Sequence, residues 1–419
     1  MMRCPTIKAA CSILYEKGDN SMEKMLEGIR VIDFTGFAAG PTCTKFLTEW
    51  GAEDIVIEPL TGSTVRTAAP DNVDFYGGFG KKYIALDLKS PEGKEAAYRL
   101  IKSADVFIHN YRPRAIKKLG LDYETLKEIN PRLVWAQITG YGEEGPNKDD
   151  PGYDTVCFWA RSGFMGDLAE KGTVLIPPIS VGDSAAGQGL AGAICAALYR
   201  REKTGLGTKV DISLFAEALF LHHHAIIASQ LGRVQYPQSR LTPWRATLNS
   251  YRCKDGKWVA LMCGGSPANH EKEFPRMMRA LDRPDIADDP RFKPYSGVMF
   301  DNAPRLVKIL DEVFAQFDRE EIISRIRGVD VAVERIQTAL DLVNDPQAQA
   351  NNLLMDVDTS FGEHITIPTT PVHFGDNQPC EYSLLPPMGV HTVDLLKGVG
   401  YSQEEIMAMA EKNITVVKE

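Results

Sequence analysis

The fold is decided by residues 28–58, which read GIRVIDFTGFAAGPTCTKFLTEWGAEDIVIE. The segment begins with an apolar run that is typical of a strand. Gly40-Pro41 then opens a helix, and Gly51 is its natural stop. A second strand follows from Asp54 to Glu58. Strand, helix and strand in this order predict one unit of a parallel sheet.

The same alternation continues through the first half of the chain. Ser90-Pro91 starts another helix, with Ser as the N-cap and Pro at the first helical position. Further strands are predicted at residues 83–88, 106–110, 133–139 and 209–214, with a small-residue helix at 185–200. We therefore expect an α/β fold, in which a parallel sheet carries helices on both faces. Ligands bind at the carboxyl ends of the strands in such sheets, and the candidate binding segments are 35–41, 109–114 and 140–145.

The second half of the chain has a different composition and order of predicted elements. Residues 232–250 are polar and predict a linker, and a hairpin turning at Asp255-Gly256 follows. Helical stretches are predicted at 268–281 and 303–328, so we expect a smaller α+β domain over residues 225–330. A hairpin around Gly362 and a last helix with a capping box from Ser402 to Glu405 complete the chain.

Length and charge limit the classes of function. A chain of 419 residues predicts two or three domains. A net charge of −9 predicts a surface that repels nucleic acid and anionic membranes. We expect neither as a partner. An anionic substrate would need a local cluster of positive charge.

Export and membrane insertion are not expected. The longest apolar run, residues 190–199, is shorter than the ~20 residues that span a bilayer. Residues 1–25 lack the apolar core of a signal peptide, because Lys8 and Glu16 interrupt it, and we expect an N-terminal extension with little function. The eight cysteines include no C-x-x-C pair, which fits a reducing cytoplasm.

Gly187 to Gly192 form a literal G-x-G-x-x-G, and Asp211 lies 19 residues after the motif at a predicted strand, as a ribose-binding acid would. This pattern allows an NAD-dependent dehydrogenase. Two observations oppose that interpretation. Asp183 stands just before the motif, where a carboxylate would face a pyrophosphate, and the glycines lie within an Ala-rich helical run. Helix packing through small residues is the alternative.

Three consecutive histidines, residues 222–224, do not predict a metal site. Neighbouring helical positions point about 100° apart, so adjacent histidines cannot share one ion on a regular helix. We expect no metal site and assign these residues to packing.

Basic residues cluster after the predicted strand that ends at Asn110. A solvated face explains such a run in most proteins, but its place at a strand end also suits a ligand that carries phosphates. A lysine pair directly before the strand predicted at 83–88 is grouped with this cluster. Together the basic residues are Lys81, Lys82, Arg112, Arg114, Lys117 and Lys118.

Asp183 is flanked by the small residues Gly182 and Ser184 at a predicted junction of loop and helix. Such a carboxylate is accessible and ionised, since an ordinary Asp has a pKa of ~3.9. It is also a favoured helix N-cap, and the two roles are compatible.

The ordered set of these segments resembles the family III CoA-transferases of the CaiB/BaiF type over about residues 26–415. The segments that carry the resemblance are 28–41, 86–93, 104–110, 140–142, 151–154, 182–183 and 203–207. The resemblance implies a Rossmann-like large domain from residues 26–224 and 331–419, a small domain at 225–330, and open chains interlocked in a homodimer.

The resemblance places the nucleophile of the family on Asp183. It implies that this carboxylate attacks an acyl-CoA, and that an acyl anhydride and an aspartyl-CoA thioester follow. Coenzyme A and acyl-CoA would be substrates, with no tightly bound cofactor. Asp154 matches an acidic residue close to the nucleophile. The positions that match the CoA-binding stretches are Ala38, Lys81, Asn110, Tyr111, Arg112 and Lys118.

Departures from the family pattern bear on the substrate. Formyl-CoA transferase has Gln where this chain has Ala38, so a small polar acid would lose a partner. Its glycine-rich lid corresponds here to a segment with Pro243 and Trp244. The texture is closest to the CoA-transferases of amino-acid fermentation that act on phenyllactate or 2-hydroxyisocaproate, although Ser184 replaces their usual His. An α-methylacyl-CoA racemase is an alternative, but its His base is replaced by Tyr153, a phenol with a pKa of ~10.

Overall fold

The computed structural model describes residues 24–66, 75–232, 234, 236–375 and 381–418. Contacts divide the chain into two compact units. The first comprises residues 1–34, 44–107 and 370–419, and the second comprises 35–43 and 108–369. Most of the predicted N-terminal extension lies outside the described residues, and the domain boundaries inferred from the sequence stay predictions.

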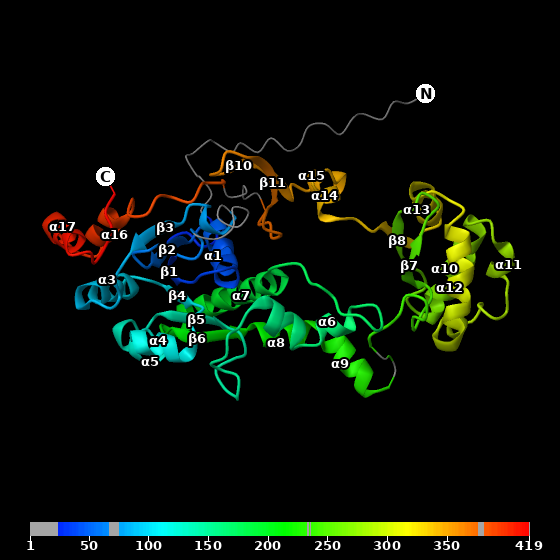
Figure 1. Cartoon of the computed structure of the whole chain (residues 1–419), viewed down its shortest axis with the longest axis horizontal. Coiled ribbons are helices and arrows are strands. Elements are labelled where there is room, and N and C mark those ends of the chain that lie inside the picture. The colour runs from blue at the N-terminus through cyan, green and yellow to red at the C-terminus, as the bar shows by residue number, and fades with distance from the viewer. Residues whose placement is uncertain (1–23, 67–74, 233, 235, 376–380, 419) are drawn as a thin grey trace, which may run out of the picture. The chain divides into compact units, whose positions relative to one another are not determined.

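The main sheet has six strands in the order β3-β2-β1-β4-β5-β6 (Figure 1). This is the strand order of the Rossmann fold. Neighbouring strands pair in parallel, with Ile32 of β1 opposite Ile55 of β2 and Gln137 of β5 opposite Asp211 of β6. The strands are β1 (Arg30–Phe34), β2 (Glu53–Glu58), β3 (Lys82–Ala85), β4 (Val106–His109), β5 (Val134–Thr139) and β6 (Thr208–Ser213). The α/β prediction is confirmed.

The end of the chain packs on the first unit beside β3. Leu86 forms an antiparallel bridge with Thr415, and the Asp87 amide donates to the Ile414 carbonyl at 2.8 Å. The expected N-cap, Ser90, accepts from the Gly93 amide. Helices with residues in this unit are α1 (Ala39–Glu49), α3 (Pro91–Lys102), α16 (Thr392–Gly398) and α17 (Gln403–Glu411), the last with the predicted capping box.

The second unit contains the long helix α7 (Val181–Thr204), which is packed through small residues. A Cβ on Gly187 would lie 2.5 Å from the Ala39 carbonyl oxygen of α1, whereas Gly192 has open space. The glycine motif therefore lies inside a helix rather than in a phosphate-binding turn. The other helices of this part are α4 (Pro113–Leu119), α5 (Tyr123–Ile129), α6 (Phe164–Asp167), α8 (Leu214–Leu221) and α9 (His223–Gln230).

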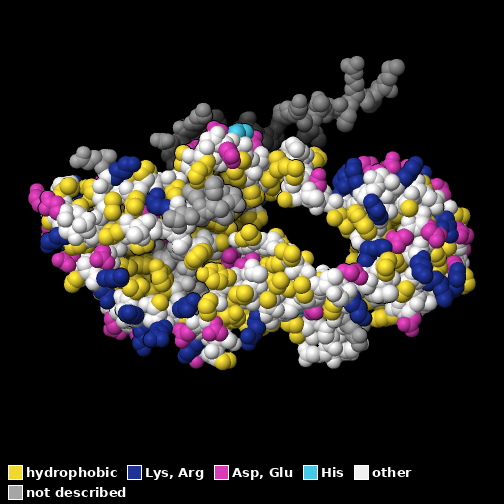
Figure 2. Space-filling model, viewed as in Figure 1, with side chains coloured by type: hydrophobic (Ala, Val, Ile, Leu, Met, Phe, Trp, Pro, Cys, Tyr) yellow, Lys and Arg dark blue, Asp and Glu magenta, His cyan; other side chains and the backbone are white. Residues whose placement is uncertain are grey.

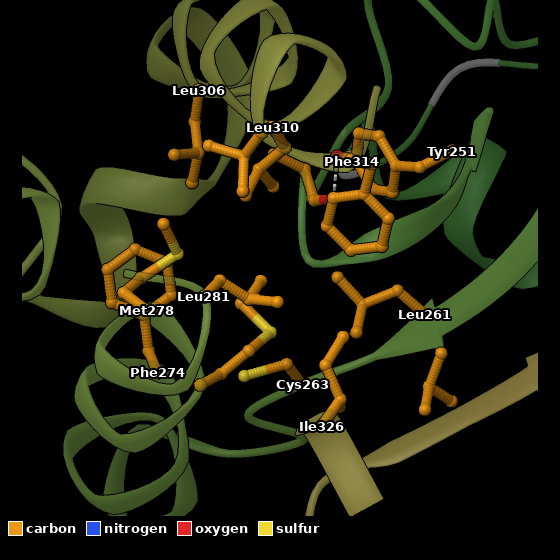
Figure 3. Packing of buried hydrophobic residues seen from close by; sticks show 14 of the residues in the cluster. Tyr251, Leu261, Cys263, Phe274, Met278, Leu281, Leu306, Leu310, Phe314 and Ile326 are labelled. Carbon is orange, nitrogen blue, oxygen red and sulfur yellow. Dashed lines mark hydrogen bonds between the residues drawn. The ribbon is translucent and has the colours of Figure 1, made fainter. Parts of the chain in front are cut away.

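A second core of the same unit lies between an antiparallel sheet, β7-β8-β9, and four helices. Figure 3 shows Tyr251, Leu261, Phe274 and Phe314 among its buried side chains. The Tyr251 hydroxyl donates to the Ala246 carbonyl at 2.6 Å. The elements are β7 (Leu248–Arg252), β8 (Trp258–Met262), β9 (Ala332–Arg335), α10 (Pro267–Ala280), α11 (Pro284–Ala287), α12 (Ala303–Phe314) and α13 (Arg319–Arg327).

The hairpin expected around Gly362 is formed by β10 (Leu354–Asp358) and β11 (His364–Pro368). Two short helices, α14 (Ala339–Leu342) and α15 (Pro346–Ala350), precede it. Within the described part of the chain, no helix is long and apolar enough to cross a membrane. Figure 2 shows basic and acidic side chains interspersed over the part that carries α10 to α13.

Candidate active site

Asp183 is the third residue of α7 and lies half-buried at the start of that helix. Ser180 occupies the N-cap position, with a left-handed φ of 64°. The N-cap interpretation of Asp183 is therefore wrong, because the helix begins three residues earlier than that role requires. A carboxylate in the first turn still interacts favourably with the free amides and the dipole of the helix.

Asp154 is the second carboxylate of the site and is 7% exposed. It precedes a π-helical turn, Thr155–Ala160, and its Oδ2 accepts from Trp159 Nε1 at 3.3 Å. Its Oδ1 is buried without a hydrogen-bond partner among the described residues. Burial raises the pKa of Asp154, while Trp159 and the amides at the start of α7 partly offset that effect.

Glycines bring the two carboxylates together. A Cβ on Gly182 would lie 2.3 Å from Asp154 Oδ1 and 2.2 Å from Phe158 Cγ. A Cβ on Gly140, at the end of β5, would lie 2.7 Å from the Gly152 Cα. Any larger residue at these positions would push the Asp154 segment away from the sheet edge and from α7.

The pKa of Asp183 is raised to about 7, mainly by burial and further by the negative charge of Asp154. Near neutral pH its charged and uncharged forms therefore both occur. A carboxylate with a raised pKa is a better nucleophile than an ordinary one, because basicity and nucleophilicity rise together. Perturbed pKa values of this kind cluster at functional sites.

The start of α1 faces the same part of α7. Gly187 contacts Ala39 of α1, and Asp183 lies one helical turn earlier on the same face. Ala38 is 7% exposed and precedes α1 directly. Ala38 is therefore the residue before the one that contacts this face of α7, and its contact with CoA stays a prediction.

Asn110 fixes the loop between β1 and α1. Its Oδ1 accepts from the Gly36 amide at 3.1 Å, and its Nδ2 donates to the Gly36 carbonyl at 2.7 Å. Tyr111 and Arg112 follow and are exposed, and Arg112 also donates to the Asp149 carbonyl at 3.3 Å.

The remaining basic residues divide into exposed and buried positions. Lys118 is exposed near the end of α4. Lys81 is 3% exposed, and its Nζ lies 3.2 Å from Asp54 and 3.7 Å from Asp33. Burial raises the pKa of Asp54 to about 7. In this arrangement Lys81 neutralises buried carboxylates rather than facing solvent, and its contact with CoA stays a prediction.

His222 is held by an aromatic contact and two polar contacts. Its ring stacks on Phe164 with centroids 4.3 Å apart. Its Nδ1 lies 3.1 Å from the Ser162 carbonyl and its Nε2 lies 3.3 Å from Asp167 Oδ2. Across the residues that the structure describes, no group of three or more His, Cys, Asp or Glu side chains could hold a metal ion.

Sequence reasoning missed the bond between Asp154 and Trp159. On an α-helix, the residue four positions later would lie beside Asp154, and that residue is Phe158. The π-helical turn instead presents Trp159, five positions later. The segment expected to replace the lid is fixed by backbone contacts, since the Phe300 amide donates to the Trp244 carbonyl at 2.8 Å.

The fold and the paired carboxylates define an α/β protein with an acidic centre at the carboxyl edge of its sheet. The family model of the CoA-transferase family III matches residues 26–392. The chain belongs to this family and is a family III CoA-transferase.

Two relatives match almost the whole chain. The chain is 35% identical to "(R)-2-hydroxy-4-methylpentanoate CoA-transferase" of Clostridioides difficile, with 91% of this chain and 97% of the relative covered. It is 36% identical to "Cinnamoyl-CoA:phenyllactate CoA-transferase" of Clostridium sporogenes, with 94% and 98% covered. Among solved structures, a CAIB/BAIF family protein from Brucella suis matches with a TM-score of 0.75 and 27% identity, covering 90% of this chain and 100% of that one.

Proposed function

We propose that the protein moves CoA from an acyl-CoA to a free carboxylic acid, with Asp183 as the nucleophile. The observation that carries this proposal is a half-buried carboxylate with a pKa of about 7 beside a second carboxylate. Coenzyme A and acyl-CoA are substrates in this scheme, and no tightly bound cofactor takes part. Ala38, Lys81, Asn110, Tyr111, Arg112 and Lys118 are the proposed CoA-binding residues.

The proposed reaction has two symmetrical halves. The Asp183 carboxylate attacks the thioester carbonyl, which gives a mixed anhydride and releases the CoA thiolate. The thiolate attacks the aspartyl carbonyl of the anhydride, which frees the donor acid and leaves an aspartyl-CoA thioester. The acceptor carboxylate then attacks this thioester. The released thiolate takes the acceptor acyl group and restores Asp183.

The chemistry of the site supports this route. The ionised form of Asp183 is the attacking species, so the rate should rise as the pH increases through about 7. The positive end of the α7 dipole supports stabilisation of the oxyanion of each tetrahedral intermediate. Asp154 is the proposed assisting acid, and its buried Oδ1 has no hydrogen-bond partner among the described residues.

The proposed acceptor is a 2-hydroxy acid with an apolar side chain, as in amino-acid fermentation. The names of the two relatives that are 35% and 36% identical to the chain support this class of acid. Ala38 also supports it, because an alanine offers no side-chain partner to a small polar acid. The proposed location is the cytoplasm, in agreement with the free thiols of Cys43, Cys157 and Cys253.

We also propose a homodimer of interlocked chains. Helices α8 and α9 expose large apolar side chains, among them Phe220 at 72%, Ile227 at 53% and Leu231 just after α9 at 56%. Exposed apolar surface of this kind is typical of a contact with another protein chain. The mass of the particle in solution tests this assembly.

The test of the reaction is a trapping experiment. The protein is incubated with cinnamoyl-CoA and then with hydroxylamine, and the modified peptide is mapped by mass spectrometry. We expect modification at Asp183 and loss of CoA exchange in Asp183→Ala. The exposed Asp149 provides a matched control, since Asp149→Ala should keep both properties. An Asp183→Ala protein that exchanges acyl groups at the normal rate would rule out the proposal.

A further inference from the structure

Two exposed aromatic rings contact each other beside the carboxylates. Phe37 is 60% exposed and Tyr153 is 56% exposed. Their ring centroids lie 5.8 Å apart in an edge-to-face arrangement. Each ring belongs to a segment that the site already uses, because Phe37 precedes Ala38 and Tyr153 precedes Asp154. Together they form an apolar surface that water now covers in part.

The backbone of Phe37 is held in an unfavourable conformation. Its φ is 62°, in the left-handed region that residues with a Cβ avoid. The preceding residue, Gly36, is fixed by both polar atoms of the Asn110 side chain. Strain of this kind persists where surrounding contacts impose it, and it is concentrated at functional sites. An exposed ring gains little stability in return for the strain.

The two segments flank Asp183 on α7. The Asp154 segment meets Gly182, the residue before Asp183, and the start of α1 meets Gly187, one turn after it. The segments that carry Phe37 and Tyr153 therefore border the part of α7 where the acyl group is proposed to bond. The substrate atoms nearest to that bond are those of the acyl side chain, whereas the phosphates of CoA are many bonds away.

We propose that Phe37 and Tyr153 form the contact surface for the side chain of the carboxylic acid. The pair then selects acids with an apolar side chain. Asp183 is a neutral thioester when the acceptor attacks, but a negative charge on Asp154 would repel a second carboxylate, so dicarboxylic acids are disfavoured at the same place. This inference rests on the proposed function, because it assigns the specificity of the Asp183 reaction.

A matched pair of acceptor acids tests the proposal. Phenyllactate and lactate differ only in the phenyl group. With one acyl-CoA donor for both, kcat/KM for the acceptor reports only the half-reaction in which the acid attacks the enzyme-bound thioester. We expect Phe37→Ala and Tyr153→Ala each to lower the ratio of kcat/KM for phenyllactate over lactate by about 10- to 100-fold. Phe37→Leu, which keeps an apolar side chain, should lower it less.

The control is Phe361→Ala, which removes an exposed phenylalanine from the turn between β10 and β11. This variant should keep the wild-type ratio. An unchanged ratio in Phe37→Ala and Tyr153→Ala would overturn the inference. An equal loss of kcat/KM for both acids would also overturn it, because such a loss would indicate a structural role or a subunit contact. This holds whether or not the mass of the particle changes.

Hydroxylamine trapping separates this inference from the proposed function. Asp183 labelled in wild type and in both ring variants, together with an unchanged ratio, refutes only the role of the rings. A wild-type protein in which Asp183 is never labelled refutes the proposed function and the inference with it.

Discussion

Replacing Asp183 by Asn removes a carboxyl whose pKa is raised from 3.8 to about 7. Between these two pKa values, the folded protein keeps a proton on Asp183 that the unfolded chain releases. The free energy of unfolding therefore falls as the pH rises from about 4 to 7, because the unfolded state binds fewer protons. A shift of about three units corresponds to a limit of ~4 kcal/mol at ~1.36 kcal/mol per unit. The side chain is only half-buried, so solvent screening reduces the gain for D183N to about 1–3 kcal/mol at pH 8.

Thermal unfolding at pH 8 and pH 5 measures this gain. We expect the midpoint of D183N to lie a few degrees above that of the wild type at pH 8. At pH 5 the gain should be about a third as large. The reason is that pH 5 lies only about one unit above the pKa of the unfolded chain, whereas the full gain builds up over about three pH units. Asp149→Asn, which changes an exposed carboxylate, should shift neither midpoint. A D183N protein that gains nothing at pH 8, or gains equally at both pH values, would refute the assigned pKa.

Two pairs of variants and one single variant test the packing and the charges. Gly187→Ala should destabilise the protein by ~2 kcal/mol or more in urea, because its Cβ would lie 2.5 Å from a backbone oxygen of α1. Gly192→Ala has open space and should stabilise by up to ~1 kcal/mol, and equal effects would contradict the packing of α7. Lys81→Met leaves two buried carboxylates without their cation and should cost ~3–5 kcal/mol. Lys82→Met breaks an exposed pair and should cost under ~1 kcal/mol, so similar losses would refute the burial of the first lysine. Asp154→Asn removes a charge that raises the pKa of the proposed nucleophile, so the pH midpoint of hydroxylamine trapping should fall, and an unchanged midpoint would show that burial alone sets it.

The alternation of strands and helices was predictable from the sequence because local signals mark it. Ser90 and Ser402 cap helices as their spacing indicates. The prediction fails where tertiary packing decides. The sequence after the strand at 209–214 predicts one long helix to about residue 231, but the structure divides it at His222, whose ring packs on Phe164. The helical stretch 303–328 is likewise two helices, α12 and α13.

The candidate site was only partly predictable. The small residues around Asp183 and its place near the start of a helix are visible in the sequence. Its raised pKa is not, because it depends on burial in the folded chain and on Asp154 from another segment. Lys81 was predicted at a binding surface because a lysine pair in the sequence carries no information about burial. The structure places its ammonium 3.7 Å from Asp33 and 3.2 Å from Asp54, and its contact with CoA stays a prediction.

The return of the chain end to the first unit has a consequence for synthesis on the ribosome. Strands β1 to β3 emerge early, but their unit also contains residues 370–419. The backbone contacts of Leu86 with Thr415 and of Asp87 with Ile414, beside β3, can form only after those last residues have been synthesised. At ~5–20 residues per second, the residues between 107 and 414 take roughly 15 to 60 s to translate. During that time the nascent sheet has an open edge, and a chain that stops short of residue 414 never closes it.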